Sequence, residues 1–592
     1  MKINLIKRSL LVALSTTSLI GLSAPAFAQD TAAANAPVED SGEIIVSARR
    51  RNESIQDTPI AITAINSAQL ESKGAVNIGD LMGTAPNLVI TNQNSGGAAA
   101  NLSIRGLTYA DVEKSQEPTV GVVVDGVFIG TSTGQFFDFF DIDQVEVLRG
   151  PQGTLFGRNT IGGVVNIKRT RPTGEFGGKA EISYGSYGAL ATRAVLNVPL
   201  IDHQLALKFF DFHNENKGYY RDGITGERRG GNNNENFGAS VLVAPDGSNF
   251  DAVLTVEKQV QKFDVVVSSL SGTGEAFCNQ ATIDYIVGLS GGPAGSVQAA
   301  SAAECGRNNR EDLYTVFGSP AVSNYSAPAV TLEMNYNLGG IKLTSVSGYR
   351  NSEENQTQDF DGARTDLYYT RRIQDYAQWS QELRAAGKIG SSFDYVVGGY
   401  WFKSDYSLTQ YTRFFGQSPN IDPIVVDKAP QLVQGATRSL AIFGDFNWAF
   451  ADKLRLSFGG RFTRDKKSLS NAYGGVLLGQ GQGTFKKFTP KIGLDYRPNS
   501  DTMIYASWSR GFRSGGFSPR AGTAITAGVA YEPETVDSYE IGTKLDLFDR
   551  KLQFNVAAFY SKYDKLQQNT TIPGGPTGNQ TITSNVGSAD IK

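Results

Sequence analysis

The chain has 592 residues, a formal net charge of −3 and two histidines. Its length exceeds that of one ordinary soluble domain. The charge excludes the basic footprint of a nucleic-acid-binding protein, and so few histidines argue against a haem or a histidine-based metal site. The 66 glycines, 24 tyrosines and 33 phenylalanines, beside only 4 methionines, favour β-structure with many turns.

The N-terminal residues predict export. Basic residues near the start precede an apolar run, and Ala26-Phe27-Ala28 is a small-x-small cleavage site. We therefore assign residues 1–28 to a signal peptide. Residues 29–42 are rich in alanine, aspartate, asparagine and proline without periodicity, which predicts a disordered leader.

Residues 43–51 form an apolar, β-branched strand that ends in three arginines. A free extended segment of this kind can add a strand to the sheet edge of a partner, but it can equally be the first strand of the next domain. From residue 52 to about 172, short strand-like and helix-like segments alternate, which predicts a compact α+β domain.

From about residue 177 onward, long segments alternate apolar and polar residues, most clearly at 453–462, 540–547 and 551–560. Tight turns at 337–340, 498–501 and 548–551 alternate with long polar segments at 217–234, 263–327, 409–436, 467–484 and 512–536. Short turns on one side and long loops on the other are typical of a membrane β-barrel. We predict such a barrel over residues 177–592, with about 16 strands present.

The two cysteines, Cys278 and Cys305, lie in the same long polar segment. In an oxidising compartment they are predicted to form a disulfide that staples this loop. Two free thiols are the alternative.

Several motifs resemble one known family. They are LSIRG at 102–106, VVVDGV at 122–127, IDQVEVLRGPQGTLFGRN at 142–159, IGGVVNI at 161–167, YASWSRGFR at 505–513 and YEIGTK at 539–544. These segments resemble the plug and barrel of TonB-dependent outer-membrane receptors, and the resemblance extends over residues 43–592. The segment after the leader resembles their TonB box, formed here by Glu43, Ile44, Ile45, Val46, Ser47 and Ala48.

The resemblance implies a plug domain at 52–172 inside the lumen of a barrel of about 22 strands. The chain stops within a strand-like segment, so we expect it to be an incomplete part of a longer protein. The implied function is active import of a scarce ligand across the outer membrane, with an iron–siderophore complex as the leading cargo. Cobalamin, a glycan or an aromatic compound are alternative cargoes, and a passive porin is the rival function.

The implied partners are the C-terminal domain of TonB, energised by ExbB and ExbD, and the lipid of the outer membrane. We expect a monomer with no cofactor, no resident metal and no nucleic-acid partner. We also expect no enzymatic activity, because the chain has no convincing serine–histidine–aspartate grouping.

Two further sets of residues are predicted to be functional. Arg105 and Arg149 end apolar strands of the plug and should pair with Glu382 and Glu540, which alternation places on the inner face of the barrel. Pairing within the plug is the alternative. The candidate ligand contacts are Tyr368, Tyr369, Arg371, Arg372, Phe414 and Phe415. They could instead be loop-packing or membrane-interface residues.

Overall fold

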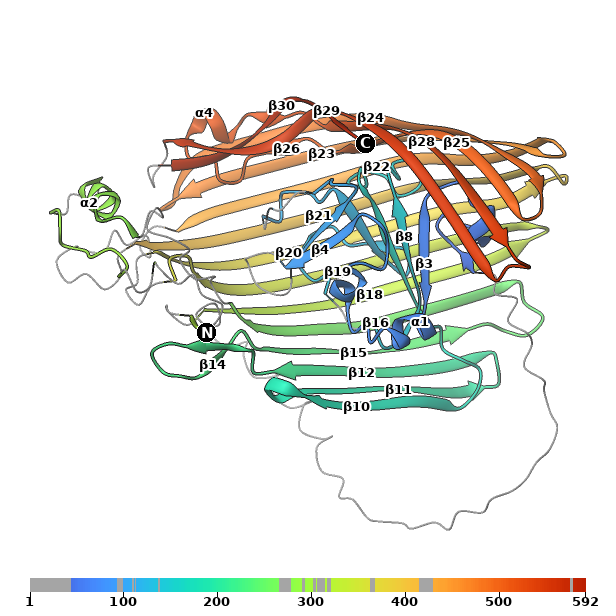
Figure 1. Ribbon diagram of the computed structural model, residues 1–592, viewed down its shortest axis with the longest axis horizontal. Helices are drawn as coiled ribbons and strands as arrows, with labels where there is room; N and C mark the ends of the chain where they lie inside the picture. Colours follow the sequence, from blue (N-terminus) through green and yellow to red (C-terminus); the bar gives the residue numbers. More distant parts are fainter. Residues whose placement is uncertain are drawn as a thin grey trace, which may run out of the picture. The chain divides into compact units, whose positions relative to one another are not determined.

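The computed structural model describes residues 44–92, 99–108, 111, 113–136, 139–265, 278–289, 293–301, 305, 315–316, 321–362, 368–414, 430–574 and 579–592. Residues 44–592 form one compact unit. Its two main parts are a small N-terminal part that contains strands β3 to β9, which we call the plug, and a long sheet that we call the wall. Figure 1 shows short plug strands crossing the direction of the long wall strands.

The plug is built on a five-stranded sheet in the order β3-β8-β9-β6-β7. Strands β6 and β9 are parallel, and the other neighbours are antiparallel. Both are mostly apolar and buried along nearly their whole length, as expected for strands covered on both faces. Its strands are β3 (Ile62–Asn66), β4 (Leu88–Asn92), β5 (Ala100–Ile104), β6 (Val120–Val124), β7 (Val127–Phe128), β8 (Ile142–Arg149) and β9 (Gly163–Arg169).

Helix α1 (Ser67–Ser72) begins at Asn66, whose side chain accepts a hydrogen bond from the Gln69 amide and whose own amide donates to the Gln69 side chain. This reciprocal cap starts a helix of less than two turns. Leu70 packs into the plug core with Ile65 and Ile142. Short 3₁₀ turns are η1 (Ile55–Asp57), η2 (Ile78–Leu81) and η3 (Ser186–Gly188).

The wall is a 16-stranded antiparallel sheet, which confirms the predicted strand number. Within the described residues, β10 and β30 each pair with one neighbour only. Its strands are β10 (Gly177–Gly185), β11 (Ala189–Ile201), β12 (Leu205–Asn216), β15 (Asn232–Val243), β16 (Phe250–Asp264), β18 (Val322–Leu338), β19 (Ile341–Asp359), β20 (Tyr368–Ile389), β21 (Phe393–Phe414), β22 (Gln431–Ala451), β23 (Leu454–Tyr473), β24 (Val476–Asn499), β25 (Thr502–Arg513), β28 (Glu534–Leu547), β29 (Leu552–Pro573) and β30 (Asn579–Ile591).

Alternation along the wall strands separates an inner face toward the plug from an outer face. On β20, Gln374, Gln378 and Glu382 are buried on the inner face, whereas Trp379 and Leu383 are exposed on the outer face. Polar residues inside and apolar residues outside are the pattern of a strand with lipid on one side and protein or water on the other.

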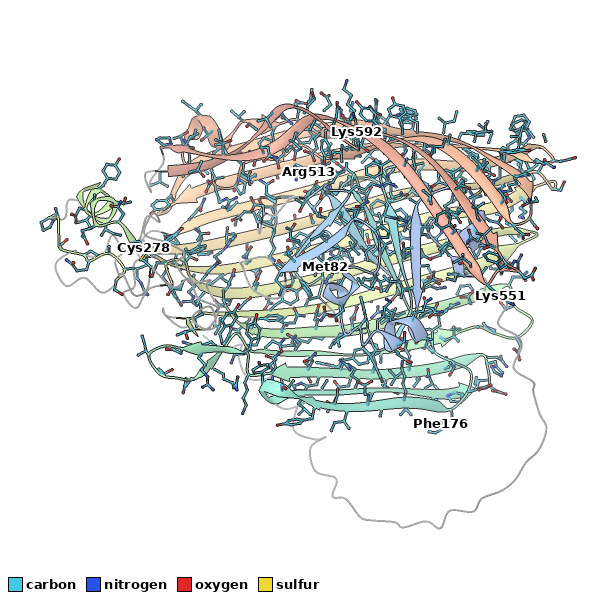
Figure 2. All side chains as sticks on the ribbon, viewed as in Figure 1. Met82, Phe176, Cys278, Arg513, Lys551 and Lys592 are labelled. Atoms are coloured by element: carbon cyan, nitrogen blue, oxygen red, sulfur yellow. A yellow bond between two sulfur atoms is a disulfide. The ribbon has the colours of Figure 1, made fainter. Side chains whose placement is uncertain are left out.

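The two ends of the wall differ. We call the end where short turns join the strands the turn end, and the end with the long connections the loop end. Short turns join β18 to β19, β24 to β25 and β28 to β29 at the turn end, as predicted. Cys278 and Lys551, labelled in Figure 2, mark the loop end and the turn end respectively. The prediction of a long loop at 467–484 is wrong, because β23 and β24 extend through this range and only residues 474 and 475 join them. No helix in the described ranges is long and apolar enough to cross a membrane.

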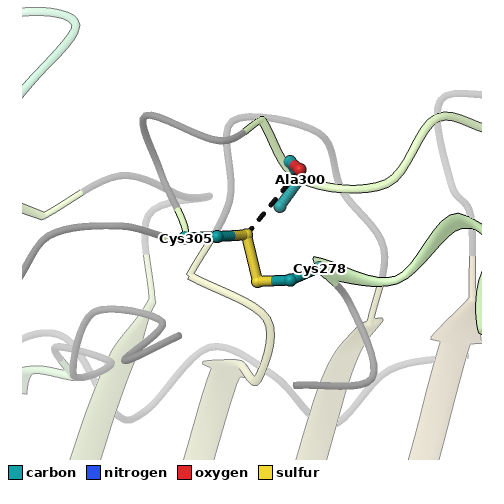
Figure 3. The surroundings of a disulfide bond; sticks show 3 residues. All are labelled: Cys278, Ala300 and Cys305. Atoms are coloured by element: carbon teal, nitrogen blue, oxygen red, sulfur yellow. Dashed lines mark hydrogen bonds between the residues drawn. A yellow bond between two sulfur atoms is a disulfide. The ribbon is translucent and has the colours of Figure 1, made fainter. Parts of the chain in front are cut away.

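Several short helices and strands lie at the loop end. They are β13 (Tyr220–Asp222), β14 (Arg228–Arg229), α2 (Gln280–Leu289), β17 (Thr315–Val316), β26 (Gly516–Phe517), α4 (Ala524–Ala527) and β27 (Ala530–Tyr531). Cys278 and Cys305 form a disulfide beside α2 (Figure 3). The disulfide closes this segment of the loop, as the oxidising compartment suggested.

Candidate functional site

The segment that resembles a TonB box is folded against the plug. Its strand β1 (Ile45–Val46) pairs antiparallel with β2 (Glu53–Ser54), and the Ile55 amide donates to the Ile44 carbonyl at 2.8 Å. Val46 and Ala48 are each 1% exposed. Glu43 lies outside the described residues. In this arrangement one edge of β1 is paired with another strand of the same chain.

A buried carboxylate holds the end of this segment. Glu146 Oε1 accepts hydrogen bonds from the Ser47 amide at 2.5 Å and from Ser47 Oγ at 3.1 Å. Asn166 Nδ2 donates to the other carboxylate oxygen at 2.9 Å. Burial raises the pKa of Glu146, although these hydrogen bonds oppose the shift.

The three arginines after this segment, Arg49–Arg51, which we call the arginine run, contact the wall. Arg49 Nη2 lies 2.9 Å from Asp445 Oδ1, and Arg51 Nη2 lies 2.8 Å from the same oxygen. Arg50 Nη2 lies 3.2 Å from Glu382 Oε2. Burial lowers the pKa of the Arg50 guanidinium, with Glu382 acting in the opposite direction.

The run was visible in the sequence as a basic stretch, but its role as a wall contact was not predicted. Asp445 was missed as well. A signal for it existed, because it alternates with the outward residues Phe446 and Trp448 on β22 and therefore had to face inward.

The two arginines that were predicted to contact the wall, Arg105 and Arg149, differ in their contacts. Arg105 forms an ion pair with Glu540, and its guanidinium lies 4.0 Å from the centre of the Phe559 ring. Arg149 lies near Arg105 and Glu540, and burial lowers its pKa. Glu382 faces the plug, as alternation suggested, but its partners are Arg50 and Arg384 rather than Arg105 or Arg149.

Glycines of the plug motifs allow close approaches to the wall. Gly157 has a φ of +87°, and a Cβ there would lie 2.9 Å from the Arg461 guanidinium. A Cβ on Gly153 would lie 2.8 Å from the Arg510 carbonyl oxygen. Glycine is required at Gly157 for both its backbone conformation and its contact.

At the loop end, the residues from Asp111 to Pro118, which we call the apical segment, carry charges to the wall. Asp111 forms an ion pair with Arg520. The remaining pairs are Glu113–Arg372 at 2.7 Å, Lys114–Glu354 at 3.0 Å and Glu117–Lys467 at 3.0 Å.

Glu117 contacts a cation of the plug as well as one of the wall. Its Oε1 lies 2.7 Å from Arg158 Nη1 of the plug. Burial alone would raise the pKa of Glu117, but Arg158 and Lys467 hold it below its ordinary value. The ionised form of Glu117 is therefore favoured in the folded protein.

The predicted ligand contacts divide between the two faces of β20. Arg372 is buried on the inner face beside the apical segment, and Arg371 is exposed on the outer face. Tyr368 stacks on Phe360 with ring centres 4.8 Å apart, and Tyr369 lies under Arg413 at 4.8 Å. Neighbouring strand residues point to opposite faces, so these four side chains cannot line one site. Phe415 and the Phe414 side chain lie outside the described residues.

A cavity of about 250 Å³ lies between the plug and strands β12, β15 and β16. Asn214, Asn234, Asn236, Gln259 and Gln261 line its wall side, and they alternate onto the inner face. Side-chain oxygens of Asn234, Asn236 and Gln261 are buried and accept no hydrogen bond within the described part of the chain. The cavity offers neutral acceptors and aromatic edges.

No cluster of three or more histidine, cysteine, aspartate or glutamate side chains suited to a metal ion occurs among the described residues. The polar groups of the interface instead pair with one another across the plug and the wall.

Two family models match this chain. One, described as a TonB-dependent receptor plug domain, matches residues 54–164, and the other, described as a TonB-dependent receptor-like β-barrel, matches residues 279–592. The pesticin receptor of Yersinia enterocolitica is 23% identical over 585 residues, which are 97% of this chain and 77% of that receptor. The metal-pseudopaline receptor of Pseudomonas aeruginosa is 25% identical over 75% of this chain and 60% of the relative.

Solved structures show the same fold. The ferric yersiniabactin uptake receptor of Yersinia pestis has a TM-score of 0.73 at 20% identity, covering 90% of this chain and 75% of that one. The siderophore receptor PiuA of Acinetobacter baumannii has a TM-score of 0.69 at 16% identity, covering 91% and 76%. The chain belongs to the family of TonB-dependent receptors, which are transport receptors of the bacterial outer membrane.

Proposed function

We propose that this receptor imports a ferric siderophore. The observation that carries this cargo class is that several relatives and similar structures are named as receptors for a metal chelate or a ferric siderophore. The relatives are named as receptors for pesticin, metal-pseudopaline and ferripyoverdine, and they match 97%, 75% and 88% of this chain. A similar fold is named as a ferric yersiniabactin uptake receptor.

The ligand would meet the apical segment first when it arrives from the loop end. Arg372 lies there on the inner face, held by Glu113 at 2.7 Å. An anionic chelate would compete with Glu113 for this guanidinium, because Arg binds carboxylate and similar oxygen pairs in the same geometry. Ligand binding would thereby loosen one contact between plug and wall.

A binding experiment tests the cargo. The purified receptor is titrated with ferric catecholate, hydroxamate and phenolate siderophores while its intrinsic fluorescence is recorded. We expect one ferric class to bind and Arg372→Gln to weaken that binding, whereas Arg371→Gln on the outer face leaves it unchanged. Absence of binding by every ferric chelate, or equal behaviour of the two variants, would contradict the proposal.

For energy input, we propose that Glu43–Ala48 binds the C-terminal domain of TonB as an added strand, with ExbB and ExbD supplying the work to a monomeric receptor. One edge of β1 is paired with β2, and Val46 and Ala48 are buried, so the segment has to leave the plug before it can pair with a partner. Cross-linking tests this step. Ile45→Cys should couple to TonB more strongly with cargo present, whereas Ala64→Cys in β3 should not. The native cysteines form a disulfide and do not compete.

We also propose that the chain divides into a signal peptide (1–28), a disordered leader (29–42), a TonB box segment (43–51), a plug domain (52–172) and an incomplete transmembrane barrel (177–592). The last plug strand ends at Arg169 and the first wall strand begins at Gly177. N-terminal sequencing of the receptor from outer membranes should start at Gln29. A start at Met1 would contradict the signal peptide.

A glycan is a second candidate cargo, and the amide-lined cavity favours it. Neutral amide acceptors beside Phe136, Phe212 and Phe263 suit the hydroxyl groups and apolar faces of a sugar. Titration with an oligosaccharide panel separates the two cargoes. Asn234→Ala should weaken sugar binding and leave binding of a ferric chelate unchanged.

A further inference from the structure

Four cationic side chains gather on the outer face of the wall. Arg438 lies on β22, Arg464 and Lys466 lie on β23, and Lys486 lies on β24. All four are exposed. Arg464 and Lys466 are two positions apart on one strand, so they point to the same side.

The register brings these charges close together. Arg438 is directly opposite Lys466, and Arg464 is directly opposite Lys486. Directly opposite residues on one face have Cβ atoms about 4.5–5.5 Å apart, and like charges there repel. No ion pair or hydrogen bond of these four side chains is found within the described ranges.

The neighbouring strand does not neutralise them. Lys403 on β21 is opposite Arg438, which adds a fifth cation at the margin. Asp405, the outward carboxylate next to it, already binds Lys403 at 2.8 Å. The patch therefore keeps its positive charge.

The patch lies at the border of the apolar surface. The next outward residues toward the turn end are Trp401, Leu440, Phe462 and Phe488, and all are more than 40% exposed. The outward apolar residues of β22 continue to Trp448. Leu440 and Trp448 are eight positions apart, about 26 Å along a strand. For a strand tilted by about 40° this is about 20 Å of height, which is most of an apolar band of about 25 Å.

In the outer membrane the long loops face outward and the short turns face the periplasm. The four cations therefore lie at the level of the headgroups of the outer leaflet. Arginine and lysine on the outer face cost little at this depth, whereas they would be unfavourable in the middle of the band.

We propose that Arg438, Arg464, Lys466 and Lys486 form a binding site for the phosphate groups of an outer-leaflet lipid. The acyl chains of this lipid would lie on the exposed rings and leucine of the adjacent band. A phosphate relieves the repulsion of both opposed pairs, and the planar guanidinium of arginine donates hydrogen bonds to two phosphate oxygens at once. The site does not depend on the identity of the imported cargo.

Lipid A and its dephosphorylated form are the probes. The purified full chain in non-ionic detergent is titrated with each lipid, and binding is measured by native mass spectrometry. We expect Arg464→Gln combined with Lys466→Gln to weaken binding of lipid A by about tenfold or more. Dephosphorylated lipid A should bind the unmodified receptor about as weakly as lipid A binds this double variant.

Lys262→Gln is the matched control. Lys262 is exposed on the outer face of β16, but its opposite residues are Asn233 and Asn324 rather than cations. Its substitution should leave lipid binding unchanged. Equal binding of lipid A to the double variant and to the unmodified receptor would overturn the proposal, as would equal binding of the two lipids.

Two further measurements cover other outcomes. If the double variant does not fold, Lys486→Gln should weaken lipid A binding severalfold, and binding to the unmodified receptor should fall as salt is raised. Salt-independent binding would contradict a phosphate site. A phosphorylated disaccharide without acyl chains should bind much more weakly than lipid A. Equal affinity would identify a site for soluble anions instead of a lipid.

Discussion

The plug meets the wall with opposite charges at its two ends. At the turn end, cations of the N-terminal region contact acids of the wall, in the pairs Arg49–Asp445, Arg50–Glu382, Arg51–Asp445 and Arg105–Glu540. At the loop end, acids of the apical segment contact cations of the wall in the pairs Glu113–Arg372 and Glu117–Lys467, and Asp111 contacts Arg520 between β26 and α4. Only Lys114–Glu354 runs the other way among the apical pairs of the described residues.

This reversal teaches what the ion pairs do. A buried ion pair adds little net stability, because desolvation offsets the attraction, but an unpaired buried charge is strongly unfavourable. A plug that was inverted or shifted toward either end would bring like charges together. The pairs therefore specify the position of the plug, while apolar contacts such as Val46 and Ala48 with Phe443 and Val396 provide the attraction.

The comparison also separates the tasks of the two ends. A force applied to residues 43–48, which resemble a TonB box, acts on the arginine run before it acts on the apical segment, because Arg49 follows Ala48 directly in the chain. A ligand from outside reaches the apical segment first. The ends can therefore be perturbed one at a time.

The largest effect is expected at the turn end. Asp445→Asn removes the shared acid of Arg49, Arg51 and Lys491, and its side chain is fully buried. Arg49 and Arg51 keep Glu53 as a second acid, but Lys491 is left without an ion-pair partner among the described residues. Breaking a buried ion pair by removing one partner costs about 3–5 kcal/mol. The free energy of unfolding in detergent, measured by urea titration, should fall by that amount.

Asp405→Asn is the control on the neighbouring strand. Asp405 also binds a lysine, Lys403, but on the outer face and half exposed. Its loss should cost less than about 1 kcal/mol. Equal losses for the two variants would mean that burial does not decide the strength of these contacts.

Double-mutant cycles test whether the ion pairs at the turn end and at the loop end affect different properties of the receptor. We expect a coupling of about 1–3 kcal/mol for Arg50→Gln with Glu382→Gln and for Arg372→Gln with Glu113→Gln. The first cycle should change the thiol reactivity of Ile45→Cys, and the second should change ligand affinity. Both cycles acting on both readouts would show that the two ends are not separate.

The alternation of residues was enough to predict the wall, because lipid on one side and the plug on the other impose a period of two. The same rule correctly oriented Glu382 and Glu540. It did not identify partners, since Arg50 and Glu382 are 332 residues apart and their contact depends on the register of every strand between them.

The error at residues 467–484 has a related cause. Beyond the apolar band, the outer face of a strand meets headgroups and water instead of lipid chains. Lys466, Ser468 and Ser470 on the outer face are polar there, so the alternation disappears although β23 continues to Tyr473. The alternation therefore indicates where the strand leaves the apolar part of the membrane, not where the strand ends.

The two ends should respond to pH with opposite sign. Glu117, with a pKa below its ordinary value of 4.5, stabilises the fold when ionised, and this contribution is lost as the pH falls through the lowered pKa. Glu146 has a raised pKa, so its contribution is greatest below 4.5 and is lost as the pH rises through the raised value.

Thermal unfolding of three proteins between about pH 3 and 8 checks these signs. Relative to the unmodified receptor, Glu117→Gln should reduce the loss of stability on the acidic side. Glu146→Gln should reduce the decline toward neutral pH. Matching profiles for the two variants would contradict the assignment of opposite shifts to the two carboxyls.

The smallest effect is expected from a pair at the turn end that has the reversed order of charges. Asp57 of the N-terminal region forms an ion pair with Arg497 of the wall, but the Asp57 side chain is 51% exposed and Arg497 also binds Asp495 at 3.1 Å. Because water solvates both groups and Arg497 keeps a second acid, Asp57→Asn should cost less than about 1 kcal/mol, and raised salt should remove the difference. A loss comparable to that of Asp445→Asn would show that this pair also positions the plug. The order of charges at the turn end would then no longer distinguish it from the loop end, and burial would have to be abandoned as the property that selects the contacts that matter.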